Sequence, residues 1–152
     1  MKDTNRLYFY GPPGNGKTLL ARAIACEANA KFISISGPDF EKPLLGESEA
    51  YIESIFKTAR ENAPCIIFID EIDSVGKRSD DSSGSVQARN NIINKILTEL
   101  DGFNPMEGVT VIAATNRLNC LDEALTRPGR FPNIFIFLYQ RKSNVRKYWI
   151  FI

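Results

Sequence analysis

Residues 6–18 read RLYFYGPPGNGKT, and this stretch decides the fold. Its first five residues are mostly apolar and aromatic, which is typical of a β-strand, and the Gly/Pro cluster that follows predicts a turn. Residues 16–28 are rich in alanine, and Leu20 and Ile24 lie four residues apart, so a helix is predicted after the turn. A strand, a glycine-rich turn and a helix in this order are the context of a phosphate-binding loop.

The turn satisfies the pattern G-x-x-x-x-G-K-[ST] between Gly11 and Thr18. Glycines let successive backbone N–H groups point at phosphate oxygens, and the start of the helix adds a positive dipole end. Lys17 supplies a positive charge for the terminal phosphates, and the Thr18 hydroxyl can ligate Mg²⁺. A turn that only starts a helix is the simpler alternative, but the flanking strand and helix favour nucleotide binding. The predicted nucleotide-binding residues are Pro13, Gly14, Asn15, Gly16, Lys17, Thr18 and Leu19.

Polar residues follow two further apolar runs. Cys65–Ile69 is continuously apolar, as expected for a strand buried on both faces of a parallel sheet, and Asp70 and Glu71 come next. Asp70 can hold Mg²⁺ through its water shell, and Glu71 can polarise a water for attack on the terminal phosphate. Asn116 follows the predicted strand 109–114 and could orient that water, although Asn is also common where strands end.

The rest of the chain alternates strand and helix patterns. Residues 31–36 and 134–139 are predicted strands, and helical periodicity occurs over 52–59 and 92–100. Residues 77–85 are polar and rich in Ser and are expected to form a mobile loop. Five strands with helices between them indicate an α/β fold with a parallel sheet covered on both faces, and ligands then bind beyond the carboxyl ends of the strands.

The composition excludes several function classes. A chain of 152 residues with 43% apolar and 24% charged residues is ordinary for one globular domain. A net charge of +1 gives no reason to expect nucleic acid or a membrane surface, and no apolar run could cross a bilayer. The absence of histidine excludes Ser-His-Asp catalysis and the HExxH zinc site within this chain. Three widely spaced cysteines and no secretory leader indicate an intracellular protein, with the cytoplasm as the first expectation.

Other nucleotide-binding classes fit less well. Residues 73–76 match the DxxG pattern of GTPases, but 94–97 read NKIL and lack the aspartate of the guanine-reading NKxD pattern, so a GTPase is disfavoured. A nucleotide kinase would need neither Glu71 beside Asp70 nor a downstream arginine pair.

Four motifs, spread over residues 7–131, resemble those of the AAA family of ATPases. Residues 11–18 resemble Walker A and CIIFIDEID at 65–73 resembles Walker B. AATNR at 113–117 is similar to sensor 1, and LDEALTRPGRF at 121–131 is similar to the second region of homology, which is highly specific. The resemblance implies a P-loop NTPase fold, a three-layer sandwich with a five-stranded parallel sheet, and ATP and Mg²⁺ as cofactors.

The resemblance also implies an assembly. Arg127 and Arg130 match the family's arginine fingers, which reach into the neighbouring subunit's nucleotide site and stabilise charge on the transferring phosphoryl group. Fingers supplied in trans require subunits that close head to tail, so a ring, usually hexameric, is implied. Without the resemblance, two arginines flanking Pro-Gly would be interpreted as a solvated basic turn.

Subfamily features conflict. Residues 42–49 resemble the segment that carries pore loop 1, but Leu44 stands where many members have an aromatic residue, so gripping of polypeptide is expected to be altered or absent. GESE at 46–49 is like the segregase-type members. We expect the chain to belong to that subgroup or to an unassigned group of the family. Residues 68–76 and 100–103 are equally like the membrane-anchored AAA proteases.

The family pattern is lost after Phe131, where Pro132 stands in place of the usual Asp, and the helical lid is absent from the sequence. We therefore divide the chain into an ATPase core, residues 1–139, and an atypical tail, residues 140–152, and expect a truncated part of a longer protein. The apolar residues 148–152 form a potential association patch.

These observations predict a Mg²⁺-dependent ATPase, coupled in a ring to the remodelling or unfolding of a protein substrate. The alternative is a nucleotide-binding fragment or regulatory subunit that does not hydrolyse ATP. Glu71 favours hydrolysis, whereas Leu44 and the missing lid favour the alternative for this chain.

Overall fold

The computed structural model describes residues 6–42, 44, 46–79, 83–101, 108–126, 131, 133–137 and 149–151. The strands are β1 (Arg6–Tyr10), β2 (Lys31–Ser36), β3 (Cys65–Asp70), β4 (Val109–Thr115), β5 (Asn133–Phe137) and β6 (Trp149–Phe151). The helices are α1 (Lys17–Glu27), α2 (Glu47–Glu61), α3 (Gly84–Asp101) and α4 (Glu123–Thr126), and the 3₁₀ helices are η1 (Gly37–Phe40), η2 (Ile72–Ser74) and η3 (Leu118–Cys120).

The strands form one sheet in the order β2-β3-β4-β1-β5-β6. The first five of these pair in parallel, which confirms the predicted five-stranded parallel sheet, and β6 adds a short antiparallel edge strand beside β5. Asp70 pairs with Ser36, and Tyr10 pairs with Thr115, so the carboxyl ends of β1, β2, β3 and β4 lie along one edge of the sheet.

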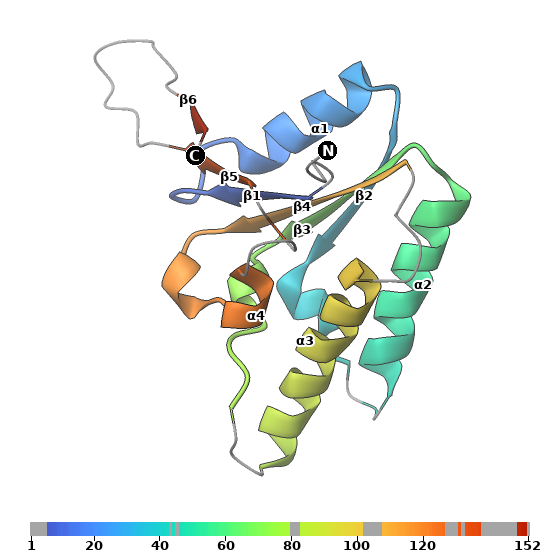
Figure 1. Ribbon diagram of the computed structural model, residues 1–152, viewed down its shortest axis with the longest axis vertical. Helices are drawn as coiled ribbons and strands as arrows, with labels where there is room; N and C mark the ends of the chain where they lie inside the picture. The colour runs from blue at the N-terminus through green and yellow to red at the C-terminus, as the bar shows by residue number, and fades with distance from the viewer. Residues whose placement is uncertain are drawn as a thin grey trace.

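Helices cover both faces of the sheet, as a three-layer sandwich requires (Figure 1). α2 and α3 lie on one face and bury the apolar stripes predicted from their periodicity, such as Ile52 and Ile96. α1 lies on the other face and packs through Ala21 and Ala25, whereas Ile24 stays partly exposed. Small side chains on the packed face allow α1 to approach the sheet closely. Among the described residues, no helix is both long enough and apolar enough to span a membrane.

The loop expected over residues 77–85 is shorter than predicted. α3 already begins at Gly84, so the prediction is wrong for its last two residues. The carbonyl of Ser83 accepts hydrogen bonds from the N–H groups of Val86 and Gln87, and these bonds start the helix within a polar stretch that has no apolar periodicity.

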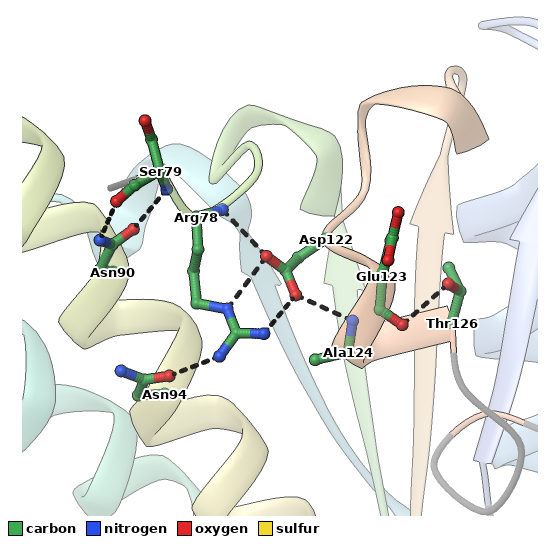
Figure 2. A network of polar contacts seen from close by, with 8 residues as sticks. All are labelled: Arg78, Ser79, Asn90, Asn94, Asp122, Glu123, Ala124 and Thr126. Carbon is green, nitrogen blue, oxygen red and sulfur yellow. Dashed lines mark hydrogen bonds and ion pairs between the residues drawn. The ribbon is translucent and has the colours of Figure 1, made fainter. Parts of the chain in front are cut away.

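An ion-pair network joins this loop to α3 and α4 (Figure 2). The guanidinium of Arg78 donates from Nε (3.1 Å) and NH2 (3.0 Å) to the two oxygens of Asp122, and its NH1 donates to Asn94 on α3 (3.2 Å). The Asp122 side chain is only 7% exposed, whereas that of Arg78 is 39% exposed. Burial alone would raise the pKa of Asp122, but hydrogen bonds from Arg78 and Ala124 outweigh it and hold that pKa below its usual value.

The network predicts a pH-dependent contribution to stability. Because the pKa of Asp122 is lower in the folded chain, the contribution is complete above the usual carboxyl pKa of about 3.9 and is lost as the pH falls below it. Arg78→Ala is therefore expected to lower the free energy of unfolding by about 1–2 kcal/mol at pH 7 and by less at pH 3, where protonation of Asp122 has begun to compete. Denaturant titrations at both pH values measure this, and a pH-independent difference would contradict it.

Candidate functional site

The loop between β1 and α1 begins at the carboxyl edge of the sheet, directly after Tyr10. Its backbone reaches positive φ at Gly14 (78°) and Gly16 (83°), a conformation that favours glycine, while the N–H of Gly11 bonds to the carbonyl of Thr115. An ideal Cβ at Gly14 or Gly16 would meet no atom within 4 Å. The glycines therefore provide backbone geometry, as expected for a loop whose N–H groups face an anion.

Lys17, the first residue of α1, is buried beneath this loop. Its Nζ donates to the carbonyls of Gly11 (2.7 Å) and Pro12 (2.9 Å) and to Oδ1 of Asn116 (2.8 Å). Burial lowers the pKa of Lys17, and the nearby carboxylates of Asp70 and Asp73 partly counter this. The structure thus brings the predicted phosphate-binding lysine and the predicted water-orienting asparagine into direct contact.

The two predicted metal ligands also meet. The hydroxyl of Thr18 donates to Oδ2 of Asp70 over 3.0 Å, which joins the start of α1 to the end of β3. Hydroxyl and carboxylate oxygens are ligands that Mg²⁺ prefers, and this ion usually takes only one or two protein ligands beside water and phosphate. The donor set and its spacing therefore fit a magnesium site shared with a phosphate group.

Glu71 follows Asp70, directly after the end of β3. It is exposed, and its backbone adopts the left-handed conformation (φ 51°, ψ 42°), which is uncommon for a residue other than glycine. Its N–H donates to Oδ1 of Asp70 (3.0 Å), and its carbonyl accepts the N–H of Ser74 (2.9 Å). These bonds hold the backbone that carries the predicted water-activating carboxylate.

A further cluster, which no local sequence pattern indicates, joins η2 to the end of β4. The carboxylate of Asp73 accepts the hydroxyl of Thr115 (2.9 Å) and Nε of Arg117 (3.2 Å), and the N–H of Arg117 donates to the Thr115 hydroxyl (3.0 Å). The Arg117 side chain is 70% exposed and that of Asp73 only 6%, so the buried bond to Thr115 contributes more than the ion pair. Asn116 lies between the two bonded residues, and the cluster therefore fixes its position relative to Glu71.

Removing this cluster is expected to slow hydrolysis more than it weakens ATP binding. Asp73→Ala should lower kcat about 10-fold and the free energy of unfolding by about 1–3 kcal/mol, because the Thr115 hydroxyl loses a buried partner. Thr115→Val removes the same bond, so a double variant should add little to either single change. Additive effects in steady-state kinetics and denaturant titrations would contradict a shared role.

The structure describes some of the other predicted site residues and not the rest. Pro13 and Gly14 are exposed on the loop, Asn15 is partly buried, and the Leu19 side chain projects from α1 with 70% exposure. Arg127 and Arg130 lie outside the described residues, as do Pro43 and Leu45 on either side of the exposed Leu44. Their roles stay predictions.

Comparisons with known proteins show the family of the chain. A family model described as ATPase family associated with various cellular activities (AAA) matches residues 7–139. The ATP-dependent zinc metalloprotease FtsH of Lancefieldella parvula is 53% identical over 121 residues, which cover 80% of this chain and 19% of that protein. FtsH of Cyanidium caldarium is 54% identical over 151 residues, covering 90% of this chain and 25% of that protein.

A protein of Plasmodium falciparum, named as a candidate cell division cycle ATPase, is 50% identical over 139 residues, covering 91% of this chain and 11% of that protein. The FtsH relatives and this ATPase are similar to the chain at nearly equal identity. The chain spans a quarter or less of each of these three relatives. With the family model matched over most of its length, the chain belongs to the AAA family of ATPases.

Proposed function

We propose that this chain binds ATP with Mg²⁺ and hydrolyses it. The observation that carries the proposal is the convergence of two hydrogen-bonded pairs, Lys17 with Asn116 and Thr18 with Asp70, at one edge of the sheet. Glu71 stands directly beside them. This set contains a cation for phosphate, oxygen ligands for a metal and a carboxylate that can accept a proton from water.

Each residue of this set has its own role in the proposed hydrolysis of ATP. Thr18 and Asp70 would hold Mg²⁺, which supplies positive charge that neutralises the phosphate oxygens. Lys17 carries a buried ammonium whose present partners are neutral oxygens, so a phosphate oxygen is a stronger acceptor for it. Glu71 is exposed and can accept a proton from the attacking water, and the amide of Asn116 can orient that water.

We further propose that the chain acts in a ring, in which Arg127 and Arg130 complete the site of the neighbouring subunit. The support is the LDEALTRPGRF sequence and the family to which the chain belongs. Contact with a protein substrate that is remodelled or unfolded is supported by the family alone, because Leu44 stands where many members have the aromatic residue that grips polypeptide. We place this activity inside the cell, where ATP is abundant, with the cytoplasm as the first expectation.

The test is the rate of ATP hydrolysis per subunit as a function of protein concentration. We expect the rate to rise until assembly is complete, because each site needs an arginine from its neighbour, and to vanish when EDTA removes Mg²⁺. A rate per subunit that does not change with concentration would contradict fingers supplied in trans. Saturable ATP binding without hydrolysis at any concentration would instead support the non-hydrolysing alternative.

A further inference from the structure

The ammonium of Lys17 uses all of its hydrogen-bond donors within the chain. A lysine ammonium has three donors and no acceptor. Its partners are the carbonyls of Gly11 (2.7 Å) and Pro12 (2.9 Å) and Oδ1 of Asn116 (2.8 Å). Lys17 is only 7% exposed, so these three contacts and not bulk water satisfy it. A phosphate oxygen can therefore accept a bond from Lys17 only if one of the three acceptors gives it up.

Two of the three acceptors belong to a constrained stretch of backbone. The N–H of Gly11 bonds to the carbonyl of Thr115 (3.3 Å), which ties the start of the loop to β4. The ring of Pro12 fixes its own φ. Moving either carbonyl would change the path of the loop, and with it the N–H groups that are expected to bind phosphate. These two bonds are therefore the costly ones to break.

The third acceptor is a side chain that can turn away. Asn116 is partly buried, and within the described part of the chain its side-chain amide bonds only to Lys17. Its backbone is held by its neighbours, because the hydroxyl of Thr115 bonds to Asp73 and accepts the N–H of Arg117. A rotation of the Asn116 side chain thus releases one donor of Lys17 and leaves both the loop and the end of β4 in place.

We propose that Asn116 competes with a terminal phosphate of ATP for Lys17 and so lowers the affinity of the site for the nucleotide. A charged phosphate oxygen is a stronger acceptor than a neutral amide, and it displaces Oδ1 of Asn116. The displaced amide can then orient the attacking water, so Asn116 reaches this role only once the phosphate is in place. The proposal deepens the proposed function and rests on it, because it requires ATP to bind at this loop.

The test is the dissociation constant of a non-hydrolysable ATP analogue with Mg²⁺, measured by titration calorimetry on the unchanged chain and on Asn116→Ala. Competition predicts that Asn116→Ala binds the analogue about 5- to 10-fold more tightly, since the phosphate no longer has to displace a hydrogen bond to a charged group. The kcat for ATP should fall at the same time, because the water loses the amide that orients it. If Asn116 only contacted the bound phosphate, its removal would weaken binding instead.

Three further variants make the comparison specific. Asn116→Asp places a carboxylate against the ammonium and should weaken binding at least about 10-fold, because the carboxylate holds Lys17 more strongly and repels phosphate. Asn119→Ala removes an exposed asparagine of η3 and should change neither binding nor kcat. The double variant Lys17→Ala/Asn116→Ala should bind the analogue no more tightly than Lys17→Ala, because the gain acts through Lys17.

The outcomes separate this proposal from the proposed function. Tighter binding by Asn116→Ala that disappears in the Lys17→Ala background supports the competition. Unchanged or weaker binding by Asn116→Ala overturns it and leaves the proposed function standing, as does a gain that persists without Lys17. If the unchanged chain shows no saturable binding of the analogue, the proposed function fails and the competition falls with it. Asn116→Ser, whose side chain is too short to reach Lys17, makes the same comparison if Asn116→Ala does not fold.

Discussion

Replacing Glu71 by glutamine is expected to lower the rate of ATP hydrolysis at least about 100-fold and to leave ATP binding intact. Glutamine has nearly the same shape but cannot accept a proton from water. The contacts expected to hold the phosphates and the metal involve Lys17, Thr18 and Asp70, and none of them uses the Glu71 side chain. Among the described residues, the hydrogen bond that links Glu71 to this set is donated by its backbone N–H to Asp70, and the substitution keeps it.

Single-turnover kinetics measure how far Glu71→Gln slows hydrolysis, and titration with a fluorescent ATP analogue measures whether ATP binding is kept. Glu27→Gln changes an exposed glutamate at the other end of α1 and should alter neither quantity. Lys17→Ala should behave in the opposite way, because it removes the ammonium beneath the loop and weakens binding itself. A Glu71→Gln variant with normal kcat would show that another group activates the water.

Local patterns in the sequence predicted the sheet and the individual residues of the site. The buried run before Asp70 and the loop before Lys17 each carry their signal within a few residues, and parallel strands then bring their carboxyl ends together. The bonds from Thr115 to Asp73 and from Arg78 to Asp122 span 42 and 44 residues, and no local motif indicates them. They depend on which loops meet once the sheet has formed.

The sequence patterns also failed to predict α4, β6 and the packed face of α1. Ala21 and Ala25 are buried against the sheet and Leu20 packs beside them, whereas the more apolar Ile24 is exposed, because a close approach of helix and sheet requires small side chains. α4 and β6 have four and three residues, fewer than a periodicity needs to be recognised. Their presence follows from contacts with the folded sheet.

Gly37 is another residue whose importance only the folded chain reveals. It begins η1 directly after β2, and β2 pairs with β3, so its backbone comes close to the turn that follows Asp70. An ideal Cβ at Gly37 would lie 2.3 Å from the carbonyl oxygen of Glu71 and 2.2 Å from Oγ of Ser74. The hydroxyl can rotate away, but the carbonyl belongs to the backbone that holds Glu71 in its left-handed conformation.

Gly37→Ala is therefore expected to displace Glu71 and to lower kcat about 100-fold, since a shift of about 1 Å at a reacting group can cost that much. ATP binding should change far less, and overpacking should lower the free energy of unfolding by about 1–3 kcal/mol.

Gly84→Ala is the matched control, because a Cβ there would meet nothing within 4 Å. Adding Ser74→Ala to Gly37→Ala relieves only the hydroxyl contact, so kcat should stay low if the carbonyl of Glu71 is the atom that matters. A Gly37→Ala variant with normal kcat, measured beside the Gly84→Ala control, would show that the turn tolerates the methyl group and that Glu71 is positioned by other contacts.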